Sequence, residues 1–270
     1  MRGLRRITAR GHSPARLLGA TLVGLVVVMA LVGPLLVDGS PTRQDLSAVL
    51  QPPSADALLG RDHLGRSVLV RLVHAARLSV SLGAASVIAA AVPGILLGLL
   101  AAWAGGWTDR VLSAVGDAVL ALPGLLLVLL VVALAPGAFW PLFLGLSLAM
   151  WVEWFRVTRA ASGALLASPA VEAARLLGFG PWHVLRRHVL PEMAPLFGTL
   201  AAFGFAGAVL AVGALGFIGI GLRPPTAEWG LMMVELLPYY DEAPLAMLAP
   251  ALCLFALVLG LQLLAGRDPR

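Results

Sequence analysis

Long apolar blocks separated by short polar segments dominate the chain. Crossing about 30 Å of hydrocarbon takes about 20 helical residues at about 1.5 Å per residue. Six blocks reach or approach that length: Leu17–Val37, Leu78–Trp103, Val111–Ala135, Phe139–Trp154, Leu196–Leu222 and Pro244–Ala265. The fourth block is the shortest, and Pro136 and Pro141 crowd its start. The pattern predicts an all-α integral membrane protein with six transmembrane helices.

The composition supports a membrane location. Hydrophobic residues make up 60% of the 270 residues and charged residues 12%, with a mean hydropathy of +0.93. Soluble proteins carry about 25% charged residues. All 19 basic residues are arginine, so the Walker A lysine of a P-loop ATPase is absent from this chain. Basic charge on a membrane protein orients helices more often than it binds nucleic acid, and we expect no nucleic-acid partner.

The first apolar block has two interpretations. Five arginines precede Leu17–Val37, which is typical of a signal peptide or of a first membrane span. The apolar region of a signal peptide is about 7–15 residues long. The greater length of this block favours a retained transmembrane helix.

The distribution of arginine predicts a multi-pass membrane protein with a cytoplasmic N-terminus. In that orientation 13 of the 19 arginines fall in cytoplasmic regions, as the positive-inside rule expects. The resulting organisation has a cytoplasmic segment 1–16, a first transmembrane helix 17–37, an extracytoplasmic segment 38–77, a core 78–265 with five transmembrane helices, and a cytoplasmic tail 266–270. Residues 168–191 form a cytoplasmic loop within that core.

The polar segment between the fourth and fifth blocks predicts a helix-turn-helix. Val171–Leu177 is expected to form a short helix, and Gly178 fits its left-handed C-cap. Pro181 fits the first position of a second helix. Pro191 and Pro195 are expected to close that helix before the fifth span.

The second of these short helices is amphipathic. Trp182, Leu185 and Val189 recur at three and four residues and share one stripe, with Arg186 and Arg187 mostly at its sides. Two helices too short to form a domain need another surface to cover such a stripe. From the residues alone, a protein partner and lipid headgroups are equally good candidates.

The sequence offers no residues for catalysis or metal binding. Its five histidines are scattered, and it has no Gly-x-Ser-x-Gly or His-Glu-x-x-His motif. The single cysteine, Cys253, excludes an internal disulfide and a cysteine-based metal cluster. We therefore expect no enzyme activity, no cofactor and no metal site.

Three residues inside the predicted spans are unusual for a membrane helix. Asp117 falls within the third span, where we favour a packing or interface role with Arg110 or Arg156 as its partner. Pro93 and Pro123 are expected to kink the second and third spans.

Three motifs resemble the dipeptide/oligopeptide/nickel permease family of ABC importers. The cytoplasmic loop matches that family's EAA loop at Glu172, Ala173, Ala174, Gly178, Leu190 and Pro191. Leu58–Gly83 is similar to the family's outer segment after the first span, and Gly216–Met233 to its element after the fifth span. The motifs occur in order over nearly the whole chain.

The resemblance implies a permease subunit of the cell's inner (plasma) membrane, with ATP hydrolysis in separate proteins. The EAA loop would dock on a nucleotide-binding subunit, with its first four matching residues shaping the contact and the last two closing it. The expected partners are a second homologous permease, two ATP-binding-cassette ATPase subunits, an extracytoplasmic solute-binding protein and membrane lipid. The expected cargo is a di- or oligopeptide or a related small solute.

Two further expectations stay open at the level of sequence. The outer element with Pro224, Pro225, Glu228 and Trp229 either links two spans or forms an outer gate or binding-protein contact. The alternative function is ion-coupled secondary transport. Such a protein would show polar relays at mid-membrane and repeated halves with broken helices, and the sequence shows neither clearly.

Overall fold

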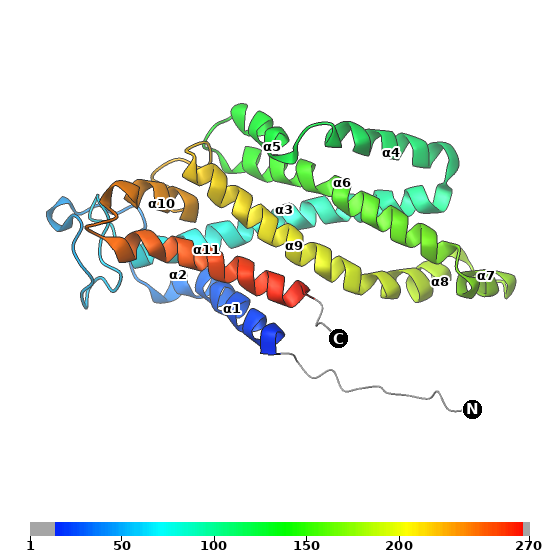
Figure 1. The fold of residues 1–270 in the computed structure, drawn as a ribbon, viewed down its shortest axis with the longest axis horizontal. Helices are drawn as coiled ribbons and strands as arrows, with labels where there is room; N and C mark the ends of the chain where they lie inside the picture. Colours follow the sequence, from blue (N-terminus) through cyan, green and yellow to red (C-terminus); the bar gives the residue numbers. More distant parts are fainter. Residues whose placement is uncertain (1–13, 267–270) are drawn as a thin grey trace.

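The computed structural model describes residues 14–266 (Figure 1). The predicted cytoplasmic segment 1–16 and tail 266–270 therefore fall almost wholly outside the described residues. Within the described range the regular structure is helical, apart from two isolated β-bridges that join Ser54 to Ala57 and Arg61 to Ser67. The predicted all-α class is confirmed for this range.

The helices have the following bounds. They are α1 (Pro14–Leu31), α2 (Gly33–Leu36), α3 (Val68–Ala104), α4 (Gly106–Leu120), α5 (Gly124–Ala133), α6 (Phe139–Leu166), α7 (Pro169–Leu176), α8 (Pro181–Val184), α9 (Leu190–Phe217), α10 (Trp229–Leu236) and α11 (Pro244–Ala265). A π-helical segment, Leu185–Val189, joins α8 to α9, and 3₁₀ turns occupy Leu46–Ala48 and Leu237–Tyr239. Figure 1 shows α7 and α8 at one end of the long axis and α10 at the other. The start of α1 and the end of α11 are directed toward the α7 end.

Four stretches are long and apolar enough to cross a membrane. They are α1, α3, the run Pro181–Phe217 that contains α9, and α11. α4 and α5 together make a fifth candidate, bent by 77° between them. α6, which carries Glu153, Arg156 and Arg159, does not meet the same criterion. The structure thus supports four or five membrane helices by length and composition, a coarser result than the predicted six.

The two prolines expected to kink their spans lie in different settings. Pro123 stands directly before α5, at the sharp bend from α4, as expected. Pro93 lies inside α3, which continues as one helix. Proline lacks an amide N–H and its ring clashes with the carbonyl four residues earlier, so either outcome is compatible with its chemistry.

Several helices extend beyond the predicted apolar blocks, and α3 and α6 do so by the most residues. α3 begins at Val68 instead of Leu78, because the Ser67 hydroxyl caps it by accepting the N–H of Val70. The end of the predicted extracytoplasmic segment 38–77 is therefore helical. α6 continues past Trp154 to Leu166. An apolar block marks only the part of a helix that the hydrocarbon core of the membrane can cover. The helix itself can continue beyond that part.

Glycines allow close approach of the helices that form the core. A Cβ atom on Gly94 of α3 would lie 2.5 Å from the Cβ of Trp154 on α6. Likewise, a Cβ on Gly19 of α1 would lie 2.8 Å from the carbonyl oxygen of Gly260 on α11. Small residues are the usual means of tight helix packing in membranes.

An ion cluster of the buried Asp62, Arg66 and Arg71 and the partly buried Glu235 organises the α10 end. The Asp62 carboxylate lies 2.6 Å from Arg66 Nε and 2.6 Å from an Arg71 guanidinium nitrogen. Glu235 of α10 lies 3.0 Å from Arg66 and 2.7 Å from Arg71. Burial alone would raise the pKa of Asp62, but the backbone N–H groups of Leu64 and Arg66 and the Arg71 guanidinium outweigh burial and lower it. The cluster ties the segment before α3 to α3 and α10.

Candidate functional site

The predicted turn at Gly178 is present. Gly178 has φ +83°, and its N–H donates to the Arg175 carbonyl at 3.0 Å. The N–H of Phe179 donates to the Ala174 carbonyl at 3.1 Å. This pair of hydrogen bonds is a Schellman C-cap, which ends α7 and fixes the direction in which the chain leaves it. Pro181 then opens α8 at a first-turn position, as predicted.

The second arm of the loop differs from the prediction. Pro191 and Pro195 do not close it, because both lie within α9, and α8 runs into α9 through the π-helical segment. There the N–H of Leu190 donates to the Leu185 carbonyl. The wider π turn comes directly before Pro191, whose ring would clash with the carbonyl of Arg187 in a regular α-helix. The second short helix and the fifth predicted span are therefore one continuous element.

The α7–α8 loop is anchored by apolar packing. Val171, Ala174, Val184, Val189 and Met193 are buried together, and leucines at the end of α6 pack against them. On the other side of α7, the Arg175 guanidinium lies 5.7 Å from the centre of the Trp103 ring near the end of α3. Such a contact is a cation–π interaction. The loop is thus connected to α3, α6 and α9 at once.

The residues of the EAA match divide between two surfaces. Glu172, Ala173 and Gly178 are exposed, whereas Ala174 is buried in the anchor. Leu190 is half-buried and Pro191 exposed, both at the start of α9. The structure brings the first four residues together on α7 and its cap. The last two lie beyond the π-helical segment.

The open apolar surface of the loop lies at its turn, and we call it the rim: Leu176, Leu177, Phe179 and Trp182. Leu176 is 84% exposed and Trp182 68% exposed. Of the predicted stripe, Val189 is fully buried, Leu185 is half-buried and packs against the same cluster, and Trp182 is open. Helical periodicity could not identify Leu176, Leu177 and Phe179, since their exposure depends on the turn at Gly178.

The outer element separates into exposed and buried residues. Pro224 and Pro225 are exposed and joined by a cis peptide bond. Glu228 caps α10, accepting the N–H groups of Gly230 at 2.9 Å and Leu231 at 2.8 Å. Burial raises the pKa of Glu228 to about 7 even though these backbone N–H groups lower it.

Trp229 is also buried, and its indole N–H donates to the Leu72 carbonyl at 3.3 Å. Neither Glu228 nor Trp229 therefore presents its side chain to a docked protein in this structure. In this structure the two side chains hold α10 against α3 and α9. Of the four predicted outer residues, only the two prolines remain on the surface.

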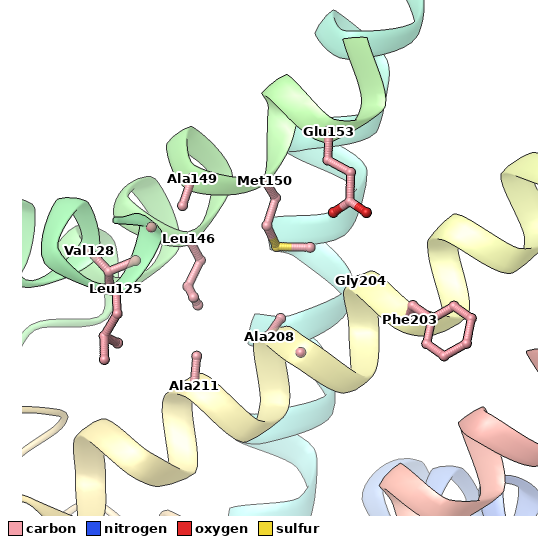
Figure 2. Close-up of a pocket in the computed structure, with 12 residues that line it drawn as sticks. Leu125, Val128, Leu146, Ala149, Met150, Glu153, Phe203, Gly204, Ala208 and Ala211 are labelled. Carbon is pink, nitrogen blue, oxygen red and sulfur yellow. The ribbon is translucent and has the colours of Figure 1, made fainter. Parts of the chain in front are cut away.

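A cavity of about 260 Å³ opens between α5, α6 and α9 (Figure 2). Leu125 and Val128 line it from α5, and small residues including Gly204 and Gly207 line it from α9. Glu153 of α6 is the one charged residue in its lining, and Figure 2 shows this side chain extending from α6 toward the α9 ribbon. No local sequence pattern marks this cavity, because its walls come from three separate helices.

The charged residues of α4 pair differently from the prediction. Asp109 forms a bidentate ion pair with Arg159 of α6, with one contact of 2.6 Å. Asp117 is exposed on α4, and neither Arg110 nor Arg156 is its ion-pair partner. Over residues 14–266, no group of three histidine, cysteine, aspartate or glutamate side chains is placed to hold a metal ion.

Comparisons with known proteins agree on one family. Residues 94–267, which include the loop and the cavity, match the family described as "Binding-protein-dependent transport system inner membrane component". The chain is 36% identical over 260 residues to the Di/tripeptide transport system permease protein DppC of Pseudomonas aeruginosa, covering 94% of this chain and 86% of the relative. It is 31% identical over 249 residues to the Dipeptide transport system permease protein DppC of Alkalihalophilus pseudofirmus, covering 90% and 82%. It is 32% identical over 259 residues to a putative peptide transport system permease protein of Brucella suis, covering 94% and 87%.

Proposed function

Because the chain belongs to the family of binding-protein-dependent transport system inner membrane components, we propose that it imports di- or oligopeptides, or a related small solute, brought by an extracytoplasmic binding protein. The chain is the permease subunit of an ABC importer, and ATP hydrolysis lies in separate subunits. The printed names of the three relatives, all peptide permeases, support a peptide cargo.

The permease works with a second homologous permease and two ATP-binding-cassette ATPase subunits. In this arrangement six segments cross the membrane, with α4 and α5 as one bent span and α6 as a further span. Six crossings put both chain ends on the same side of the membrane, with the N-terminus in the cytoplasm. The α7–α8 loop follows the fourth crossing and therefore lies on that side too. The directions of α1 and α11 toward the α7 end in Figure 1 support this topology.

The single observation that carries the coupling role is the rim: four exposed apolar residues on a loop that is anchored to α3, α6 and α9. Exposed apolar patches mark surfaces that another molecule covers. An ATPase subunit that covers the rim and moves on ATP binding would displace α8. Since α8 continues into α9, that displacement would reach the cavity wall directly and change which side of the membrane the cavity faces.

A matched pair of glycine variants tests this role in the complete reconstituted importer. Gly178→Ala places a side chain at φ +83°, where alanine costs about 1–2 kcal/mol. Gly180→Ala is the control, because Gly180 has φ −73° and both sites border open space. We expect Gly178→Ala to lower solute-stimulated ATP hydrolysis by up to about tenfold, and Gly180→Ala to stay near wild type.

Two results would count against the proposal. Equal solute-stimulated hydrolysis in wild type and Gly178→Ala would remove the loop from the coupling path. Uptake driven by an ion gradient, without any ATPase subunit, would identify the chain as a secondary transporter instead.

A further inference from the structure

The cavity between α5, α6 and α9 combines apolar walls with one carboxylate. Its other lining residues are aliphatic side chains, glycines, Met150 and Phe203. Glu153 lies near the middle of the 28-residue α6, and Gly204, which lines the facing wall, lies near the middle of the 28-residue α9. The carboxylate is thus far from both ends of each helix.

An ionisable group at this depth is expensive in a membrane, and such groups mark substrate and ion pathways. Over the described residues, Glu153 has no ion-pair or hydrogen-bond partner, although its side chain is exposed to the cavity. Arg156, which is three residues further along α6, forms no ion pair with Glu153, and Arg159 is paired with Asp109. The charge of Glu153 is therefore available to a molecule in the cavity.

The chemistry of the site selects one class of ligand. A divalent metal ion needs several oxygen, nitrogen or sulfur ligands, and the described residues provide no such group here. An anionic group would be repelled by the carboxylate. A protonated amine needs one acceptor of opposite charge, and its apolar remainder fits walls such as Leu125, Val128 and Leu146.

We infer that Glu153 is a recognition site in the transport cavity for the ammonium group of the solute. This inference rests on the proposed function, in which the cavity is part of the translocation path. Glu153 attracts the positive end of the solute to the middle of the membrane, between α6 and α9, while the apolar walls contact the rest. It makes the permease selective for amine-bearing solutes, in addition to any selection by a binding protein.

The charge of the cavity can be measured without transport. A cysteine introduced by Ala149→Cys, in a Cys253→Ser background, lies four residues before Glu153 and therefore on the same face of α6. Its reaction with a trimethylammonium methanethiosulfonate and with a sulfonate methanethiosulfonate reports the local potential. In the complete importer we expect the ratio of cationic to anionic rates to fall about tenfold on adding Glu153→Gln, and to be kept by Glu153→Asp.

A cysteine on α4 is the matched control. Ala118 is exposed and lies outside the cavity, so the rates at Ala118→Cys should not change with Glu153→Gln. An unchanged ratio at Ala149→Cys would overturn the inference. Because this assay needs no ATP and no cargo, that result would leave the proposed import function untouched.

Transport gives the second measurement, with a dipeptide and its N-acetylated form as probes. We expect Glu153→Gln to lower uptake of the free-amine dipeptide about tenfold relative to wild type, with substantial recovery in Glu153→Asp. Equal uptake of the free-amine dipeptide by wild type and Glu153→Gln would overturn the inference. Absence of any ATP-driven uptake by the wild-type importer would instead contradict the proposed function.

Discussion

The two ends of the molecule differ in which side chains they bury: one end buries charged residues, and the other exposes apolar residues. At the α10 end, Asp62, Arg66 and Arg71 are buried and Glu235 is partly buried, and the four charged residues form ion pairs with one another. At the α7 end, the four apolar residues of the rim are exposed on a loop whose inner side is well packed. The first end is completed by its own chain. The second presents a surface that only another molecule can complete.

The largest effect is expected at the ion cluster. Asp62→Asn removes the negative charge that Arg66 and Arg71 share, and leaving part of a buried ion network uncompensated costs about 3–5 kcal/mol. The free energy of unfolding in detergent, measured by thermal or denaturant titration, should fall by that amount. Asp56→Asn, an exposed position in the same segment, is the control. If both variants are equally stable, the α10 end does not depend on its buried charges.

A second effect at the same end depends on pH. Glu228 has its pKa raised by burial from 4.5 to about 7 in the folded state. Below about pH 4.5 the carboxyl is protonated in both states; between pH 4.5 and 7 it is protonated mainly in the folded state. The unfolded state then binds fewer protons, so stability falls as pH rises through this window, by up to about 3 kcal/mol.

Glu228→Gln cannot titrate and should lose that part of the pH dependence. The comparison is between the change in unfolding free energy from pH 5 to pH 7.5 in wild type and in Glu228→Gln, so any constant effect of the amide on the α10 cap cancels. An identical pH dependence in both proteins would show that Glu228 does not carry a raised pKa.

The rim should show the smallest effect on stability and a clear effect on coupling. Leu177→Asp replaces an exposed leucine, so the free energy of unfolding of the isolated chain should change by no more than about 0.5 kcal/mol. In the complete importer it should lower solute-stimulated ATP hydrolysis, because a charge would be buried against the ATPase subunit. Leu177→Met, which keeps the apolar surface, is the control. Loss of stability with normal coupling would reverse the contrast between the two ends.

Local features were predictable from the sequence. The last span is found at its predicted bounds, Pro244–Ala265, because a proline starts it and all its residues but Gln262 are apolar or small. The left-handed cap at Gly178 was also predictable, because a glycine and a following Pro181 define a turn within a few residues.

Contacts between distant segments were not predictable. Arg66 and Glu235 are 169 residues apart, so no local pattern links them. The early start of α3 was missed because Arg71 suggested an aqueous loop, whereas its charge is buried in the ion cluster. The cavity was missed because Glu153, viewed in one helix alone, has no apparent relation to α5 or α9.

The most direct test of the central claim is the location of Ala173, an exposed residue of α7. With Cys253 replaced by serine, Ala173→Cys should form a crosslink to a nucleotide-hydrolysing subunit in the assembled importer, and the yield should change when ATP is added. Labelling of this cysteine from the extracytoplasmic face by a membrane-impermeant reagent, or failure to crosslink to that subunit in an assembled complex, would contradict the account.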